Sequence, residues 1–124
     1  MKTYVGRIPG VGRGVFAAED IGEGKVIEVS EVIVIPPEEV EFLDQTTLER
    51  YYFAWGDDLK SAAIALGHGS LYNHSFSPNA RYEKHLDQGT IEFICIRAVS
   101  KGEEIRVNYN HDPNDQTPVR FEVK

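Results

Sequence analysis

Short runs of β-branched residues, each bounded by glycine or proline, constrain the fold of this chain more than any other feature. Residues 26–29, 32–35 and 91–96 read VIEV, VIVI and IEFICI. A polar turn over residues 20–25 precedes the first run, and two prolines follow the second. Runs of this length and composition are typical of strands, and glycine and proline end them. The sequence therefore predicts a mostly β protein with a few short helices, one of them over residues 38–43.

The size and charge of the chain limit its class. A chain of 124 residues has room for one domain. Its 13 Lys and Arg against 20 Asp and Glu give a net charge of −7, which argues against a nucleic-acid surface and favours a basic partner. A plain solvated acidic surface explains this charge equally well. The single cysteine, Cys95, allows neither an internal disulfide nor a multi-cysteine zinc site.

No apolar run approaches the roughly 20 residues that span a bilayer, and the N-terminus lacks the basic-then-apolar order of a signal peptide. We therefore expect a soluble, intracellular protein.

A polar segment over residues 65–82, ALGHGSLYNHSFSPNARY, lies between an apolar run and an alternating one. Asn73, Ser75, Ser77 and Asn79 have short side chains that hydrogen-bond nearby backbone groups. The segment can therefore follow a tight, non-repetitive path whose own amides point outward and meet a ligand. An ordinary polar loop with one solvated histidine would have the same composition, so the segment alone leaves both readings open.

Glycines near the N-terminus form a second unusual segment. Residues 9–17 read PGVGRGVFA, with Gly10, Gly12 and Gly14 spaced two apart. Glycine lets the backbone turn sharply and lets a ligand approach without interference from a Cβ atom. The segment lacks the third spaced glycine of a dinucleotide-binding fingerprint, and no long helix follows it. A ligand-binding segment and a plain glycine-rich hairpin are both compatible with this pattern.

Aromatic residues gather in two places. Residues 51–55 read YYFAW, and most of these rings are expected in the core. Residues 105–109 read IRVNY, so that Ile105, Val107 and Tyr109 share one face of a strand. The last strand therefore ends on a tyrosine.

The segments GRGVFA, LYNHSFSPN and GEEIRVNY, in this order and at these distances, resemble the SET-domain family of protein lysine methyltransferases. Each segment alone is weak, but the ordered triple is specific, and the likeness runs from about Tyr4 to Tyr109. It is nearest to the minimal SET proteins of viruses and bacteria, which lack zinc-binding flanks. The resemblance implies a SET domain over residues 1–110 with a short tail over 111–124. It also implies a β-clip fold of small antiparallel sheets with a C-terminal pseudoknot.

The resemblance also implies a site, residue by residue. In the family the NHS segment meets the strand that ends in tyrosine, and this match makes Tyr109 the catalytic residue. Tyr51 and Tyr82 match positions that line the channel for the substrate lysine. The cofactor S-adenosylmethionine would bind to residues from three parts of the chain: Arg13, Gly14, Asn73, His74 and Phe121. No metal is implied.

The implied activity is S-adenosylmethionine-dependent methyl transfer to a lysine side-chain amine of a protein, expected to be basic. The net charge and the lack of a long apolar run argue against contact with nucleic acid or membrane, and a homodimer stays open. We expect the protein in the cytoplasm, or in the nucleus if the source is viral or eukaryotic. Two alternatives stay open: a catalytically weak SET-like module that binds S-adenosylmethionine or a lysine-bearing peptide, and a small β-rich interaction domain without a ligand.

The sequence departs from the family pattern at three places. Phe76 stands where a cysteine commonly follows the NHS segment, and Asn108 replaces the usual acidic residue before the tyrosine. Asn108 removes a charge but keeps a hydrogen-bonding group of the same shape. The cysteines that bind zinc after the domain are absent, and Phe121 is expected to cover the adenine in their place.

Overall fold

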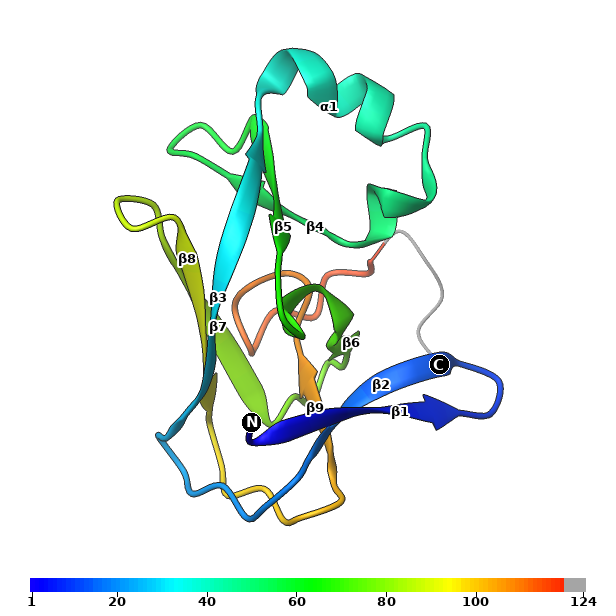
Figure 1. The fold of residues 1–124 in the computed structure, drawn as a ribbon, viewed down its shortest axis with the longest axis vertical. Coiled ribbons are helices and arrows are strands. Elements are labelled where there is room, and N and C mark those ends of the chain that lie inside the picture. The colour runs from blue at the N-terminus through cyan, green and yellow to red at the C-terminus, as the bar shows by residue number, and fades with distance from the viewer. Residues whose placement is uncertain (120–124) are drawn as a thin grey trace.

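The computed structural model describes residues 1–119, which form two sheets (Figure 1). The first sheet has four strands in the order β1 (Thr3–Ile8), β2 (Gly12–Ala17), β9 (Glu104–Val107) and β6 (Asn73–His74). The second has five strands in the order β4 (Tyr52–Trp55), β5 (Ser61–Ala65), β3 (Val26–Ile35), β8 (Thr90–Cys95) and β7 (Ala80–His85). The helical elements are α1 (Pro37–Leu43) and two 3-10 turns, Thr47–Arg50 and Gly69–Leu71. The prediction of a mostly β protein with few helices is confirmed.

The second sheet is built around β3, which joins the two valine- and isoleucine-rich runs into one strand. Its first half pairs with β8 and its second half with β5, both antiparallel. The residues between the two runs belong to the strand, because Ser30 pairs with Ile91 and Glu31 with Thr90. The two runs, 26–29 and 32–35, are therefore parts of one strand and not two strands, because the cross-strand partners continue across the residues between them.

The core lies between the sheets and contains both aromatic and aliphatic side chains. The Tyr72 and Phe93 rings pack with their centroids 4.6 Å apart, and the Tyr72 hydroxyl donates to Oε1 of Glu28 at 2.5 Å. The expectation that most rings of residues 51–55 are buried is wrong, since only Trp55 is fully buried. The other three rings are half-buried because they line a cavity that is described below.

The two sheets meet where β9 runs beside the polar segment. β6 pairs with β9 in parallel, with Asn73 opposite Arg106 and His74 opposite Val107. In Figure 1 β9 lies between β2 and β6 and so joins the N-terminal hairpin to the middle of the chain. The C-terminal pseudoknot implied by the family resemblance stays a prediction.

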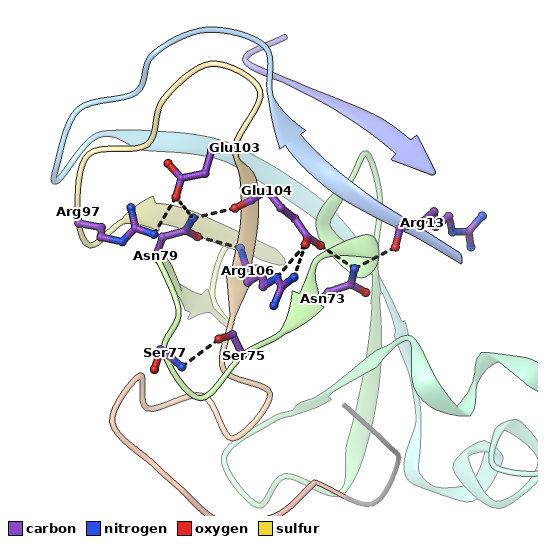
Figure 2. A network of polar contacts seen from close by, with 9 residues as sticks. All are labelled: Arg13, Asn73, Ser75, Ser77, Asn79, Arg97, Glu103, Glu104 and Arg106. Atoms are coloured by element: carbon purple, nitrogen blue, oxygen red, sulfur yellow. Dashed lines mark hydrogen bonds and ion pairs between the residues drawn. The ribbon is translucent and has the colours of Figure 1, made fainter. Parts of the chain in front are cut away.

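Asn79 fastens β9 to the start of β7. Its amide nitrogen donates to the carbonyl oxygen of Glu104 at 2.8 Å, and its amide oxygen accepts from the backbone N–H of Arg106, also at 2.8 Å (Figure 2). Asn79 is 4% exposed, so water cannot replace these bonds.

No helix among residues 1–119 is long and apolar enough to cross a membrane.

Asn79→Ala should destabilise the fold, because it leaves the Glu104 carbonyl and the Arg106 N–H buried without partners. Each such group costs about 1 to 3 kcal/mol, so urea denaturation should show a loss of roughly 2 kcal/mol or more. Ser77→Ala is the matched control, since Ser77 is exposed in the same segment. Equal stabilities of the two variants would contradict the role given to Asn79.

Candidate functional site

Pairing of β6 with β9 brings His74 against Tyr109, although 35 residues separate them. The backbone N–H of Tyr109 donates to Nδ1 of His74 at 2.9 Å, and the two ring centroids lie 5.1 Å apart. Next to this contact, the Ser75 N–H donates to the Val107 carbonyl at 2.9 Å. The chain just after β9 is thus held by the polar segment, and Tyr109 is placed by a side chain of that segment.

His74 is 4% exposed, and burial lowers the pKa of its imidazole. Because Nδ1 accepts from Tyr109, the neutral ring carries its proton on Nε2, and Nε2 has no hydrogen-bond partner among residues 1–119. The Phe76 ring packs edge-on against the imidazole, with the ring centroids 4.4 Å apart. Phe76, a departure from the family pattern, therefore shields His74 and favours its neutral form.

Asn73 links the polar segment to the glycine-rich one. Its amide nitrogen donates to the Arg13 carbonyl at 3.0 Å and to Oε2 of Glu104 at 2.7 Å (Figure 2). A Cβ atom on Gly14 would lie 2.5 Å from that carboxylate oxygen and 3.0 Å from the Asn73 amide nitrogen. Gly14 is therefore required for the backbone to approach this hydrogen-bonded pair. The glycine-rich segment forms the turn and the second strand of the β1–β2 hairpin.

Two cavities meet at Tyr109. The smaller, of about 290 Å³, is lined by Arg7, Val11, Gly12, Arg13, Tyr51, Ser70, Leu71, Asn73 and Tyr109. The larger, of about 400 Å³, has walls from β4, β7 and residues 107–119. Tyr51, Ser70 and Tyr109 line both. We call these three shared wall residues the partition.

Tyr109 is half-buried in this partition, and its hydroxyl donates to the Tyr72 carbonyl at 2.7 Å. Burial, with smaller contributions from Tyr51 and Glu104, raises the pKa of Tyr109 to about 12. Burial likewise raises the pKa of Tyr82, which is 5% exposed. Both hydroxyls therefore stay protonated and neutral across the physiological pH range.

The structure brings together most of the predicted site residues. Arg13, Asn73, Tyr51 and Tyr109 line the smaller cavity, and Tyr51, Tyr82 and Tyr109 line the larger one. The Arg13 guanidinium lies 5.8 Å from the centre of the Tyr51 ring. His74 and Gly14 line neither cavity; they lie behind Tyr109 and beneath Asn73, respectively. Phe121 lies outside the described residues.

Sequence reasoning missed Asn108 as a structural residue. Its amide nitrogen donates to the Asp115 carbonyl at 2.6 Å and reaches the Pro113 carbonyl at 3.5 Å, and its amide oxygen accepts from the Asn110 N–H at 3.0 Å. The Asn110 side chain in turn donates to the Thr117 carbonyl at 2.6 Å. Asn108 is 1% exposed, so its own hydrogen bonds are shielded from water, whereas the bond from Asn110 to Thr117 is exposed.

These bonds fix residues 110–119, which we call the clasped segment. Its residues Asn110, His111, Pro118 and Val119 form part of the wall of the larger cavity. A carboxylate at position 108 has no N–H to donate and could not hold two carbonyl oxygens. The replacement of the acidic residue therefore serves this segment. The signal in the sequence was the asparagine at position 108, where the family usually has an acidic residue.

The SET domain family matches residues 12–110, about four-fifths of the chain. The chain belongs to the SET-domain family. A Schizosaccharomyces pombe relative, named as a histone-lysine N-methyltransferase specific for H3 lysine-37, is 35% identical over 99 residues, which are 79% of this chain and 66% of the relative. A Halocynthia roretzi relative, named histone-lysine N-methyltransferase SETD7, is 30% identical over 128 residues, which are 92% of this chain and 32% of the relative. The chain thus spans at most 66% of the length of these relatives.

A solved structure supports the same assignment. The crystal structure of a Plasmodium falciparum protein described as a candidate histone methyltransferase is 30% identical to this SET domain, with a TM-score of 0.72. The likeness covers 90% of this chain and 95% of that one. The predicted family and its fold of small antiparallel sheets are confirmed.

The buried imidazole of this SET domain makes its stability depend on pH. Its pKa is lower in the folded than in the unfolded chain, so stability is full above about pH 6.5 and falls as the pH drops below that value. His74→Asn removes the titrating group but leaves an amide oxygen that can accept from the Tyr109 N–H. Urea denaturation from about pH 7 to about pH 5 should show a smaller loss for the variant. Parallel curves would contradict this account.

The clasped segment of this SET domain gives a second prediction. Asn108→Asp should lower the free energy of unfolding by about 1 to 3 kcal/mol or more, because a buried carboxylate would face two carbonyl oxygens. Limited proteolysis should then cut within residues 110–119 first. The deficit should shrink at low pH, where the protonated carboxyl can donate. Asn114→Asp, the same change at an exposed position, is the control; equal effects of both would exclude the clasp.

Proposed function

We propose that this SET domain is an S-adenosylmethionine-dependent protein lysine N-methyltransferase that transfers a methyl group directly to a lysine side-chain amine. The observation that carries the proposal is the partition between the cavities. Direct transfer needs donor and acceptor on a common line with water excluded. Two cavities that share Tyr51, Ser70 and Tyr109 in their walls are suited to hold the two reactants on opposite sides of these residues.

The smaller cavity suits the cofactor in its polar groups. Arg7 and Arg13 carry positive charge at its wall, which matches the carboxylate of an amino-acid moiety. Asn73 uses its amide nitrogen on Arg13 and Glu104, and no group among residues 1–119 donates to its amide oxygen. That oxygen can accept from the cofactor's ammonium group. When bound, the cofactor supplies an electrophilic methyl group on a sulfonium.

Arg13 and Asn73 would hold the amino-acid end directly. Gly14 and His74 act from behind, since Gly14 leaves room for the Asn73–Glu104 hydrogen bond and His74 holds the backbone of Tyr109. The predicted contact of Phe121 with the adenine stays a prediction, as does the division into a domain over 1–110 and a tail over 111–124.

The larger cavity suits a lysine side chain. Its walls are aromatic and include Tyr51, Tyr82 and Tyr109. The Phe53 ring packs edge-on against Tyr82, with the ring centroids 5.0 Å apart. A free lysine has a pKa of about 10.4, and apolar surroundings favour its neutral, nucleophilic amine. The pKa of Tyr109 is about 12, so its hydroxyl is protonated at neutral pH. The hydroxyl therefore orients the amine by hydrogen bonding and does not act as a base.

The relatives suggest a histone as the first protein substrate to test, since two of them are named as histone-lysine N-methyltransferases. The net charge of −7 agrees with a basic substrate. The same proposal includes an intracellular location and no contact with nucleic acid. It also includes a homodimer and membership of the minimal SET proteins without zinc-binding flanks.

Tyr109→Phe tests the proposal. The variant keeps the ring and loses the hydroxyl that donates to the Tyr72 carbonyl, which costs at most about 0.5 to 1.5 kcal/mol of stability. Turnover on core histones with radiolabelled S-adenosylmethionine should fall by a factor on the order of 100, while cofactor affinity by calorimetry changes little, because the contact acts in the transition state.

Tyr82→Phe removes a hydroxyl from an equally aromatic, buried wall residue and should retain transfer, with a change in the number of methyl groups added. Near wild-type turnover of Tyr109→Phe would make the tyrosine structural. Cofactor binding without turnover in the wild-type protein would instead indicate a binding module.

A further inference from the structure

Lys84 occupies an unusual position for a lysine. It lies on β7 two residues after Tyr82, so both side chains are on the same face of the strand, and both line the larger cavity. The residue directly opposite on β8 is Ile91, which is fully buried. Lys84 itself is half-buried. The wall of the cavity thus places a positive charge beside its aromatic residues.

The charged residues on the other face of β7 are paired, whereas Lys84 forms no ion pair with any residue from 1 to 119. Glu83 pairs with Arg81 at 2.5 Å, and His85 lies 3.6 Å from Glu92. Within residues 1–119, no carboxylate lies within ion-pair distance of the Lys84 ammonium. The described part of the chain, residues 1–119, thus leaves a half-buried cation without an ion-pair partner in the larger cavity, whose wall also contains Glu49 and Arg50.

An unpaired, partly desolvated cation costs free energy, and such groups gather at binding sites. Burial lowers the pKa of Lys84. Burial, and after it the Lys84 ammonium, lowers the pKa of His111. The His111 ring packs on Tyr82 with the ring centroids 4.9 Å apart, so His111 and Lys84 lie at the same part of the wall. A hydrogen bond with the Tyr82 backbone and the carboxylates of Asp112 and Glu83 raise the pKa of His111 in opposition. A target lysine entering this cavity adds a further positive charge, so an anion beside it would offset the repulsion.

We propose that Lys84 forms an anion subsite of the larger cavity, which selects protein substrates with a carboxylate or phosphate group close to the target lysine. The inference rests on the proposed methyl transfer and adds its substrate class. The spacing fits an extended peptide, in which side chains on one face are about 6.6 Å apart, like Tyr82 and Lys84 on β7. The anionic side chain therefore lies within about two residues of the target lysine.

Peptides with one central lysine in an alanine- and glycine-based sequence test the subsite. Each peptide carries one test residue, placed two residues before, one before, one after or two after the target lysine. The test residue is glutamate in the first set, phosphoserine in the second and lysine in the third. Methyl transfer gives kcat/KM for each peptide. Fluorescence anisotropy of labelled peptides gives Kd, a readout that does not depend on turnover.

In the wild-type protein, glutamate at the best position should raise kcat/KM by about fivefold over alanine, the upper range for a partly exposed ion pair. If phosphoserine raises kcat/KM more than glutamate does, a phosphate is the preferred anion. If phosphoserine raises kcat/KM less, a carboxylate is preferred. Lysine at the same position should lower kcat/KM. Added salt should reduce all these ratios.

Charge variants of Lys84 make the test specific. Lys84→Met keeps the apolar stem and should bring the glutamate-to-alanine ratio close to one, and Lys84→Glu should invert it in favour of the lysine-flanked peptide. Lys84→Arg should retain the preference. Calorimetry with S-adenosylmethionine checks that each variant is folded.

The outcomes separate the inference from the proposed function. Methylation of core histones and peptides without any preference for an anion, or a preference that survives Lys84→Met, would overturn the subsite. If no substrate is methylated, the proposed function fails, and the ratio of peptide Kd values still decides whether Lys84 selects an anion.

Discussion

The parallel pairing of β6 with β9 is the contact on which the rest of the site depends. A two-residue strand forms few ladder bonds, so side chains must hold it in place. Asn79 bonds to both neighbours of Ile105 on β9, and His74 binds the backbone just beyond the strand. Because these side chains come from one polar segment, its fold and the position of Tyr109 are determined together. Loss of this pairing would separate the tyrosine from both cavities.

Burial controls the charge of the groups around this pairing. His74 is kept neutral and Tyr109 is kept protonated, each by removal from water. The polar side chains nearby are bonded within the protein, as Asn73 and Asn108 are, so the site is organised before a ligand arrives. Such preorganisation reduces what must be ordered during a reaction.

Local sequence patterns predicted strands in residues 26–35, 91–96 and 105–109, the turn at the glycines and the polar segment, because each depends on neighbouring residues. They did not predict β4 and β5 as strands. The joining of residues 26–35 into one strand was not predictable, since it depends on partners from β5 and β8. The half-burial of Tyr51 and Tyr52 was missed for a similar reason: an aromatic run does not tell a core from a cavity wall. The ordered triple of motifs identified the family, but the bonds of Asn108 required the path of residues 110–119.

The partition of Tyr51, Ser70 and Tyr109 has two sides, and each side belongs to a different cavity. A ligand that fixes these side chains from one side changes the surface offered to the other. Affinities for the two ligands are then linked, and the linkage must be equal in both directions. A larger side chain in this wall would therefore alter both binding surfaces together. A single molecule that spans the wall, by contrast, would meet both surfaces at once and gain from their proximity.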